Sequence, residues 1–378
     1  MRNIVLFILL LAVVAAVVVR LAYGGGEEYP DLSTPPVLDE SDLHEVLAYA
    51  EPVGNVAVSA TGRVFFTVHP EARPRGNRLL EFVEGASVPY PDVGTQLGLF
   101  DSVLGITIDA RERLWTIDHG NHGLREPRLV AFDLATNTVL RDQVLVPEVA
   151  PMGSFLQDLR VSADGGTIVI ADTSFWRKSP ALIVYDVASG TARRVLEGHP
   201  AVSAEGYVVK AGDRALTYLG GLVSLKGGVD GIALGPEWLY FGAQSGSTVH
   251  RVRLADLENQ ALTAEVLGSR VEAYARKPLS AGFALDPYGN LFVTDVEHNA
   301  VYVVGNDREL RTLLRSTRLR WPDGLAFGPE DWLYVADSAL PELVLQSRAH
   351  IAAASPYRLF RFRPAGKPAG PGPLVEPQ

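Results

Sequence analysis

The chain has 378 residues, of which 47% are hydrophobic and 21% charged, so it can bury a large core as one repeat domain or as two average domains. Its formal net charge of −10 argues against a nucleic-acid partner, because phosphate binding needs a basic face, and is compatible with a cationic ligand or a metal ion. The absence of cysteine excludes disulfides, thiolate nucleophiles and cysteine-ligated zinc.

Residues 1–23 are typical of an export segment. An arginine precedes an apolar run from Ile4 to Val19, and a second arginine and a GGGEE stretch follow. The run is shorter than the roughly 20 residues of a comfortable membrane span, although Leu21–Tyr23 can extend it. A cleaved signal peptide and an uncleaved membrane anchor both remain open, and either one predicts a secreted or periplasmic body. Residues 24–43, rich in Gly, Pro and acidic residues, predict a linker.

The body then repeats one pattern six times. Each copy has alternating apolar residues, a turn rich in Gly, Pro and Asp, and a run of aromatic or β-branched residues, which predicts strand, turn, strand. The copies are GNVAVSATGRVFF (from Gly54), LGITIDARERLWTID (Leu104), QDLRVSADGGTIVIAD (Gln157), DGIALGPEWLYFGA (Asp230), AGFALDPYGNLFVTD (Ala281) and DGLAFGPEDWLYVAD (Asp323).

A second pair of strand-like runs follows the first five copies, and YRLFRFRP near the C-terminus is the candidate for the sixth. Four strands per repeat at a period of about 50 residues is typical of a propeller blade. One such sheet cannot bury both of its faces alone, so we predict a six-bladed β-propeller over residues 44–364, with a disordered tail at 365–378. An ordinary β-sandwich is the alternative.

Two segments depart from the repeat. Residues 198–228 lengthen one interval and predict an inserted loop or hairpin over a mouth of the central channel. Residues 341–354 carry the one helical pattern in the body. The acids and glycines that precede each first strand are expected to gather at one mouth of the channel.

Five blocks of the sequence carry a family resemblance. Between about Pro52 and Leu340 they are GNVAVSATGRVFFTVHP, LWTIDHGNHG with PRLVAFDLAT, SFLQDLRVSADGGTIVIADTS, GVDGIALGPEWLYF and LRWPDGLAFGPEDWLYVADSAL. In content and order they resemble bacterial members of the major royal jelly protein/Yellow family. The resemblance implies a six-bladed propeller, secretion and, as in insect members, a channel that binds small ligands such as biogenic amines. Some relatives carry dopachrome-converting names. The chain lacks the cysteines that eukaryotic members pair.

More distantly, the chain is similar to the gluconolactonase/senescence-marker family, whose members hold one divalent cation with a Glu, an Asn and an Asp. Two of those ligands stand in Asn-Gly and Asp-Gly steps, the kind of step that Asp230 and Asp323 occupy here. The first-blade acid has no clean match, because its column holds Gly54, with Asn55 adjacent and Glu51 three residues earlier. The missing Glu weakens the expectation of a metal-dependent lactonase.

Asp230 and Asp323 are the leading candidates for a ligand or metal site. In a propeller both side chains would stand near the axis, where two carboxylates and carbonyl oxygens can hold Ca²⁺ or a similar cation. They could equally pair with an amine ligand or act as general acid and base. The alternative is turn chemistry, in which each carboxylate only accepts local backbone N–H groups.

The blade alignment and one polar cluster add further candidate ligand-binding residues. Asn55 lies in the matching step of the first copy, and Gln157 and Asp158 form that of the third. His119 and His122 belong to the DHGNHG stretch that follows a blade strand. They could bind a metal, shuttle protons or simply hydrogen-bond to backbone.

Acidic and aromatic residues at the strand ends are expected to be mainly structural. Asp118, Asp172, Asp295 and Asp337 each close a second strand, where a carboxylate can accept backbone hydrogen bonds. Most tryptophans should pack between blades. Trp321, directly before the sixth copy, is also a candidate ligand wall.

Three functions remain open. The first is an exported propeller that binds a small organic ligand at the central channel. The second is a metal-assisted enzyme, a lactone hydrolase or a dopachrome-type isomerase, with one divalent cation such as Ca²⁺. The third is a protein-interaction scaffold. We expect a monomer that meets the membrane only through its N-terminal segment. The sequence contains no G-x-S-x-G, H-E-x-x-H or nucleotide-binding glycine motif.

Overall fold

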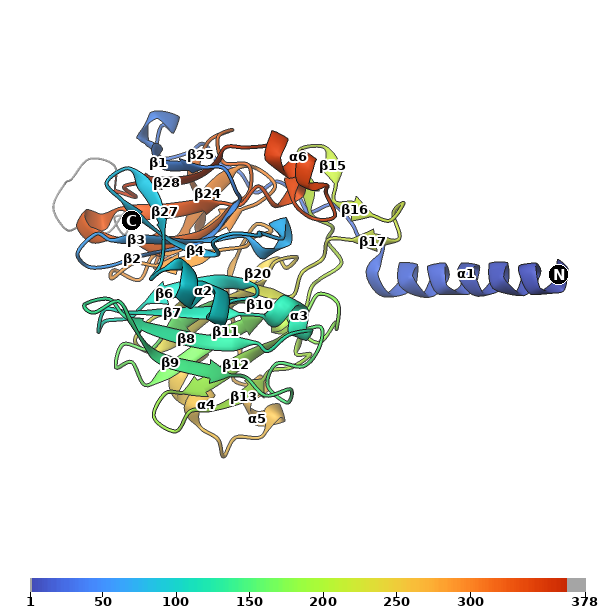
Figure 1. The fold of residues 1–378 in the computed structure, drawn as a ribbon, viewed down its shortest axis with the longest axis horizontal. Coiled ribbons are helices and arrows are strands. Elements are labelled where there is room, and N and C mark those ends of the chain that lie inside the picture. The colour runs from blue at the N-terminus through green and yellow to red at the C-terminus, as the bar shows by residue number, and fades with distance from the viewer. Residues whose placement is uncertain (1, 366–378) are drawn as a thin grey trace.

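Each copy of the repeat folds into a four-stranded antiparallel sheet, and the six sheets stand as blades of one propeller (Figure 1). The computed structural model describes residues 2–365, so the tail expected at 365–378 falls, except for its first residue, outside the described residues. The innermost strands of successive blades contact one another in a closed ring. The predicted six-bladed β-propeller is confirmed, and the sandwich alternative is wrong.

The blades follow chain order. Blade one contains β2 (Val53–Val58), β3 (Val64–Val68), β4 (Leu79–Val83) and β5 (Ala86–Pro89). Blade two contains β6 (Val103–Ile108), β7 (Arg113–Asp118), β8 (Arg128–Asp133) and β9 (Thr138–Val144). Blade three contains β10 (Leu156–Val161), β11 (Thr167–Asp172), β12 (Ala181–Asp186) and β13 (Thr191–Val195). Blade four contains β18 (Val229–Leu234), β19 (Trp238–Ala243), β20 (Thr248–Arg253) and β21 (Glu272–Arg276). Blade five contains β22 (Phe283–Leu285), β23 (Leu291–Asp295), β24 (Ala300–Val304) and β25 (Leu310–Arg315). Blade six contains β26 (Pro322–Phe327), β27 (Leu333–Asp337), β28 (Tyr357–Phe362) and β1 (His44–Tyr49).

Neighbouring blades bury each other's faces. Every residue of the middle strands β3, β11 and β24 is buried, whereas the outermost strands β5 and β9 contain only exposed and half-buried residues. The apolar clusters lie between blades, as where Trp115 of blade two joins Ile170 of blade three. Strands that are apolar on both faces are therefore stable only inside the closed ring.

The innermost strands of five blades carry a β-bulge at the start of the repeat, which contains a glycine in four of them and Gln157–Asp158 in the third blade. A bulge re-aims the side chain beside it, and here it turns Asp230 and Asp323 into the interior. Glycine recurs because neighbouring inner strands are very close. A Cβ on Gly282 would lie 1.9 Å from the carbonyl oxygen of Asp323, and one on Gly324 would lie 2.4 Å from Oδ1 of Asn55.

The sixth blade is completed by the start of the body. YRLFRFRP supplies only β28, and the outermost strand is β1, which pairs antiparallel with β28 from His44 opposite Arg361 to Tyr49 opposite Tyr357. The N-terminal strand thus closes the ring. The C-terminal repeat lacks a fourth strand of its own because the chain begins the body with that strand.

The inserted segment forms two short hairpins at one end of the propeller. They are β14 (Lys210–Ala211) with β15 (Arg214–Ala215) and β16 (Thr217–Tyr218) with β17 (Val223–Ser224). Figure 1 shows them on the same side as α3 (Gly120–Gly123) and α6 (Arg348–Ala353). The helical pattern predicted at 341–354 thus corresponds in part to α6.

The helix α1 (Arg2–Tyr23) projects from this same side of the molecule (Figure 1). It contains no buried residue, and its length and apolar composition suit a membrane span, a test that a signal sequence also passes. The export segment predicted at residues 1–23 therefore corresponds to one exposed apolar helix.

Residues 24–43, predicted as a linker, lie against the propeller. Tyr29 is buried, and its hydroxyl donates a hydrogen bond to the carbonyl oxygen of Lys277 over 3.0 Å. The amides of Val37 and Leu38 donate to the outermost strand of blade five. Its buried tyrosine and its backbone hydrogen bonds hold this irregular segment in place.

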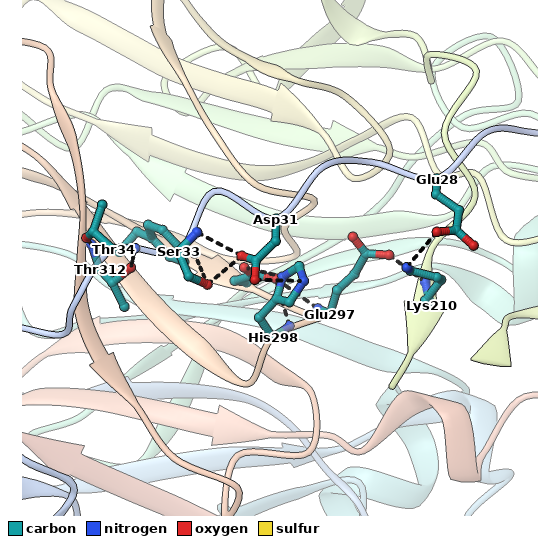
Figure 2. A network of polar contacts seen from close by, with 10 residues as sticks. Glu28, Asp31, Ser33, Thr34, Lys210, Glu297, His298 and Thr312 are labelled. Carbon is teal, nitrogen blue, oxygen red and sulfur yellow. Dashed lines mark hydrogen bonds and ion pairs between the residues drawn. The ribbon is translucent and has the colours of Figure 1, made fainter. Parts of the chain in front are cut away.

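Polar contacts hold the same segment further along. The amide of Thr34 donates to Oγ1 of Thr312 over 2.9 Å, and the amide of Thr312 donates to Oγ1 of Thr34 over 3.0 Å. Figure 2 shows the neighbouring ion pairs, which are Asp31 with His298 at 3.8 Å and Glu28 with Lys210 at 3.1 Å. The path from α1 to β1 is therefore fixed on the surface of the body.

Candidate functional site

One end of the central channel opens into a cavity, which we call the channel-end cavity. It contains about 810 Å³ of empty space, counting the part open to solvent. The inserted hairpins contribute Tyr218, Leu219 and Val223 to its wall, as expected for a segment over a channel mouth. The remaining residues used below come from the inner strands and the residues directly before them, from the DHGNHG loop and from the turns after β3, β11, β19 and β27.

The floor of the cavity is rich in hydrogen-bond acceptors. Asp230 and Asp323 lie there with Gln157 and Gln244. The amide Nε2 of Gln244 donates to Oδ2 of Asp230 over 3.0 Å, which leaves Oε1 of this glutamine free. Oδ1 of Asp230, Oε1 of Gln157 and Oε1 of Gln244 are buried without a partner among the described residues. Three unpaired acceptors beside a second carboxylate favour a ligand that donates hydrogen bonds.

Burial dominates the electrostatics of the two aspartates. It raises the pKa of Asp323 to about 7, and it raises the pKa of Asp230 well above its ordinary value, with the charges of Asp323 and Asp158 adding to the effect. Neither carboxylate forms an ion pair within residues 2–365. Without a ligand, the floor therefore holds protons at a pH where exposed aspartates have lost theirs.

Asp158 lies deeper in the channel and does not line the cavity. Its Oδ1 accepts hydrogen bonds from Nη1 of Arg160 at 2.8 Å and from Nδ2 of Asn55 at 3.5 Å. Burial raises the pKa of Asp158, and the charge of Arg160 offsets part of that rise. Arg160 faces the opposite end of the channel. Of the predicted channel residues, Asn55 and Asp158 thus form a polar contact behind the cavity, while Gln157 reaches its floor.

The walls of the cavity are mostly apolar. Phe155, Phe175 and Trp176 supply three of the aromatic rings, with leucine and valine side chains between them. Trp321, predicted as a ligand wall, does line the cavity; it is fully buried, and its Nε1 has no hydrogen-bond partner among the described residues. Such a surface fits an apolar or aromatic body.

One stretch of wall is polar. His122 lines the cavity, and its Nε2 lies 3.0 Å from Oε1 of Glu71. Burial alone would raise the pKa of Glu71, but the hydrogen bond and charge of His122 bring it below the ordinary value. Nδ1 of His122 is buried without a partner in the described part of the chain. Asn121 and His122 have φ values of 49° and 59°, a left-handed backbone that non-glycine residues adopt at a cost.

His119 does not line the cavity. It is buried against Phe155, and its Nδ1 accepts a hydrogen bond from the amide of His122 at 2.9 Å. Burial lowers the pKa of His119 to about 3, so the ring is neutral. The two histidines of the loop thus have different surroundings: His119 supports the backbone and His122 meets the ligand space.

The divalent-cation site implied by the gluconolactonase resemblance does not fit these residues. Within residues 2–365, no group of three or more His, Asp or Glu side chains is arranged to hold a metal ion. Asp230 and Asp323 reach the floor, but the blade-one carboxylate that lines the cavity, Glu71, lies on the wall beside His122, and Glu51 does not line the cavity. The third carboxylate ligand is therefore missing in three dimensions, as in the sequence.

The aspartates that close the second strands accept backbone hydrogen bonds. Asp118 accepts from the amides of Asp101 and Ser102 at 2.7 and 2.8 Å, and Asp337 accepts from the amide of Trp321 at 2.7 Å. Asp337 therefore fixes the tryptophan on the cavity wall. These contacts agree with the structural role predicted for this class of residue.

Several residues that line the cavity could not be predicted from the sequence. Glu71 and His122 meet from different blades, and their separation of 51 positions gives no local signal. Gln244 and Phe155 lie in turns between strands, outside the repeated step. Phe175, next to a tryptophan in an otherwise polar turn, is the one that composition could have suggested.

Comparisons with known proteins agree with this architecture. The sequence pattern of the family described as major royal jelly protein matches residues 101–347. A gluconolactonase from Xanthomonas campestris has a similar structure, with a TM-score of 0.52 and 16% identity over 89% of this chain and 97% of its own. A luciferin-regenerating enzyme has a TM-score of 0.54 and 12% identity over 85% and 94%. At such identities the two structures share the fold alone. No curated protein sequence matches the chain.

Proposed function

This chain belongs to the major royal jelly protein family, and from that premise we propose that it is an exported propeller that binds a small organic molecule in the channel-end cavity. The ligand class that fits best has an apolar or aromatic body and a protonated amine. The observation that carries the proposal is the asymmetry of the cavity, whose unpaired acceptors lie at the floor beneath largely apolar walls.

A cation suits this floor for electrostatic reasons. Asp230 and Asp323 are buried, burial raises the pKa of each carboxyl, and neither carboxylate has a positively charged partner in an ion pair among the described residues. An ammonium group would supply that charge and donate hydrogen bonds to the free oxygens of Gln157 and Gln244. The apolar body would then replace water against the aromatic wall.

Calorimetric titration of the full chain with phenethylamine and with its neutral analogue phenethyl alcohol tests the proposal. We expect the amine to bind at least about tenfold more tightly, which corresponds to about 1.4 kcal/mol. Asp323→Asn should abolish this preference and leave the alcohol nearly unaffected. Asp307→Asn, which removes an exposed carboxylate paired with Arg311, serves as the control. Equal binding of the two compounds, or equal losses in both variants, would contradict the proposal.

A second candidate function is proton transfer in the same cavity, as in a dopachrome-type isomerase. The observation that favours it is the pair of Glu71 and His122 on the wall. With Nε2–H directed to the carboxylate, Nδ1 of His122 is the nitrogen free to accept a proton from a bound carbon or oxygen acid. A protonated Asp323 could return a proton to another atom of the ligand, so that the number of protons is conserved.

Conversion of dopachrome by the purified chain checks this candidate. We expect His122→Gln and Glu71→Gln to lower kcat by at least about a hundredfold, the usual contribution of general acid–base catalysis. Asp307→Asn should retain full activity. No conversion by the unmodified chain, or conversion that survives both substitutions, would rule out this role for the pair.

Two remaining functions are distinguished by direct measurement. A metal-dependent lactonase requires a stoichiometric divalent cation, which elemental analysis would detect and which Asp230→Ala would remove. A protein-interaction scaffold would retain a partner in pull-down while showing no amine binding and no metal. Neither outcome is expected from a cavity with two carboxylates and apolar walls.

A further inference from the structure

We propose that the mouth of the channel-end cavity faces a lipid bilayer, with α1 retained as a membrane anchor and the rim of the cavity at the level of the lipid head groups. Ligands would then enter the cavity from the lipid phase. The entry route rests on the ligand binding proposed above, whereas the orientation of the body on the membrane rests on separate observations.

The first observation is that α1 ends at the rim of the cavity. The hydroxyl of Tyr23, its last residue, donates a hydrogen bond to the carbonyl oxygen of Trp176 over 2.7 Å. The Tyr23 ring also lies 6.3 Å from that of Phe175, centroid to centroid. Phe175 and Trp176 both line the cavity. A helix that crossed a membrane would therefore hold the cavity mouth at its surface.

The second observation is that the helix is joined to the body without slack. Nζ of Lys226 donates to the carbonyl oxygen of Gly24 over 2.9 Å, directly after the helix. Glu27 then forms backbone hydrogen bonds to Gly206 and Val208 at 2.8 and 2.9 Å. The body thus has no flexible tether on which to turn its cavity away from the membrane.

The third observation is an apolar rim. Leu219 and Leu345 are each 63% exposed and Trp176 is 44% exposed, although all three line the cavity. Met152 is 71% exposed, and the residue after it donates a hydrogen bond to the carbonyl oxygen of His122 at the same mouth. Large exposed apolar side chains gathered around one opening mark an interaction surface. Tryptophan and tyrosine beside the end of a spanning helix are typical of the membrane interface.

The charge of the rim selects a lipid surface over an apolar protein partner. Lys178 lies 4.2 Å from the centre of the Phe175 ring, and Lys226 holds the end of α1. Arg348 donates to the carbonyl oxygen of Arg73 over 3.1 Å, next to the segment that carries Leu345. Cations beside apolar side chains complement anionic head groups above acyl chains. These basic side chains stand out in a chain whose formal net charge is −10.

Fluorescence quenching in reconstituted membranes tests the orientation. The full chain is placed in vesicles of phosphatidylcholine and phosphatidylglycerol, with or without lipids brominated near the head group, and no ligand is added. We expect bromine to remove roughly one fifth of the tryptophan emission, the share of one residue among five. Trp176→Phe should abolish that quenching, because Trp115 and Trp321 are buried within the propeller. Trp238 and Trp332 lie at the starts of β19 and β27, and it is the opposite ends of these strands that lead to the cavity.

Two leucine variants provide the matched comparison. Leu219→Asp combined with Leu345→Asp should reduce the quenching of Trp176 at least about twofold. Leu97→Asp changes an equally exposed leucine (68%) in α2 (Val93–Leu99), which does not line the cavity, and should have no effect. Quenching that persists in Trp176→Phe, or that all leucine variants change equally, would overturn the proposal. So would mass spectrometry showing that the chain recovered from cells begins after Tyr23.

The proposed ligand binding and the proposed membrane orientation can be refuted independently. Quenching is measured without ligand, and amine binding can be measured in detergent without vesicles. A chain that binds phenethylamine but shows no bromine quenching would retain the proposed function and lose the membrane orientation. The reverse result would retain the orientation alone.

Discussion

When they are ionised, Asp230 and Asp323 destabilise the folded chain. The ionised form is also the one that would bind a cationic ligand. Both are almost fully buried, and neither forms an ion pair within the described chain, although the charge of Lys277 partly offsets the effect at Asp230, so each ionised form is costly. Arg160 reduces the same problem at Asp158, which lies behind the cavity. The two aspartates that line the cavity are thus the ones whose negative charge has no ion-pair partner. Binding sites commonly contain charged groups that lower the stability of the folded protein.

This cost predicts a pH-dependent gain in stability for Asp323→Asn. The pKa of Asp323 rises from 3.8 in the unfolded reference to about 7 in the folded chain, so ionisation favours the unfolded state between these values and the penalty is complete above pH 7. We expect the substitution to stabilise the ligand-free chain by roughly 4 kcal/mol at about pH 8, and by less than half of that at about pH 5. Denaturant unfolding at both pH values measures it. A gain that is independent of pH would show that Asp323 is not the titrating group.

At the level of the element, the repeated Asp-Gly step is a β-bulge. The sequence predicts the strands because alternation and turn residues are local signals, and it predicts that Asp230 and Asp323 share one end of the channel because the repeat puts them in register. It does not predict that Asn55 and Asp158 lie deeper, since the depth of a side chain depends on the neighbouring blade. The pairing of Glu71 with His122 escapes it for the same reason: the two are brought together by packing between blades.

The close packing at Gly282 predicts that adding a single methyl group there destabilises the folded chain. A Cβ at Gly282 would meet the backbone oxygen of Asp323 at 1.9 Å, and backbone cannot rotate away. We expect Gly282→Ala to lower the free energy of unfolding by about 3 kcal/mol, because β22 must shift away from β26. Gly76→Ala, at an exposed site with no atom within 4 Å of the added Cβ, should change it by less than about 0.5 kcal/mol. Denaturant titration of both variants gives the comparison, and similar losses would refute close packing as the reason for the glycine.

For the whole molecule, closure of the ring depends on β1. Leu47 is buried in the apolar cluster that joins blades one and six, and its strand is the outermost of the sixth sheet. We expect Leu47→Ala to destabilise the chain by about 2–4 kcal/mol. Glu45→Ala on the same strand removes an exposed ion pair with Arg358 and should cost less than about 1 kcal/mol. Equal unfolding free energies for the two variants would mean that β1 does not hold the ring shut.

The partnership of β1 with β28 also governs how the protein can be made. β1 is the first strand to leave the ribosome and β28 is the last, so the nascent chain carries an unpaired strand edge for the whole of its synthesis. β1 can therefore pair wrongly until β28 has been made, and a chain truncated before Phe362 lacks a complete partner strand for β1.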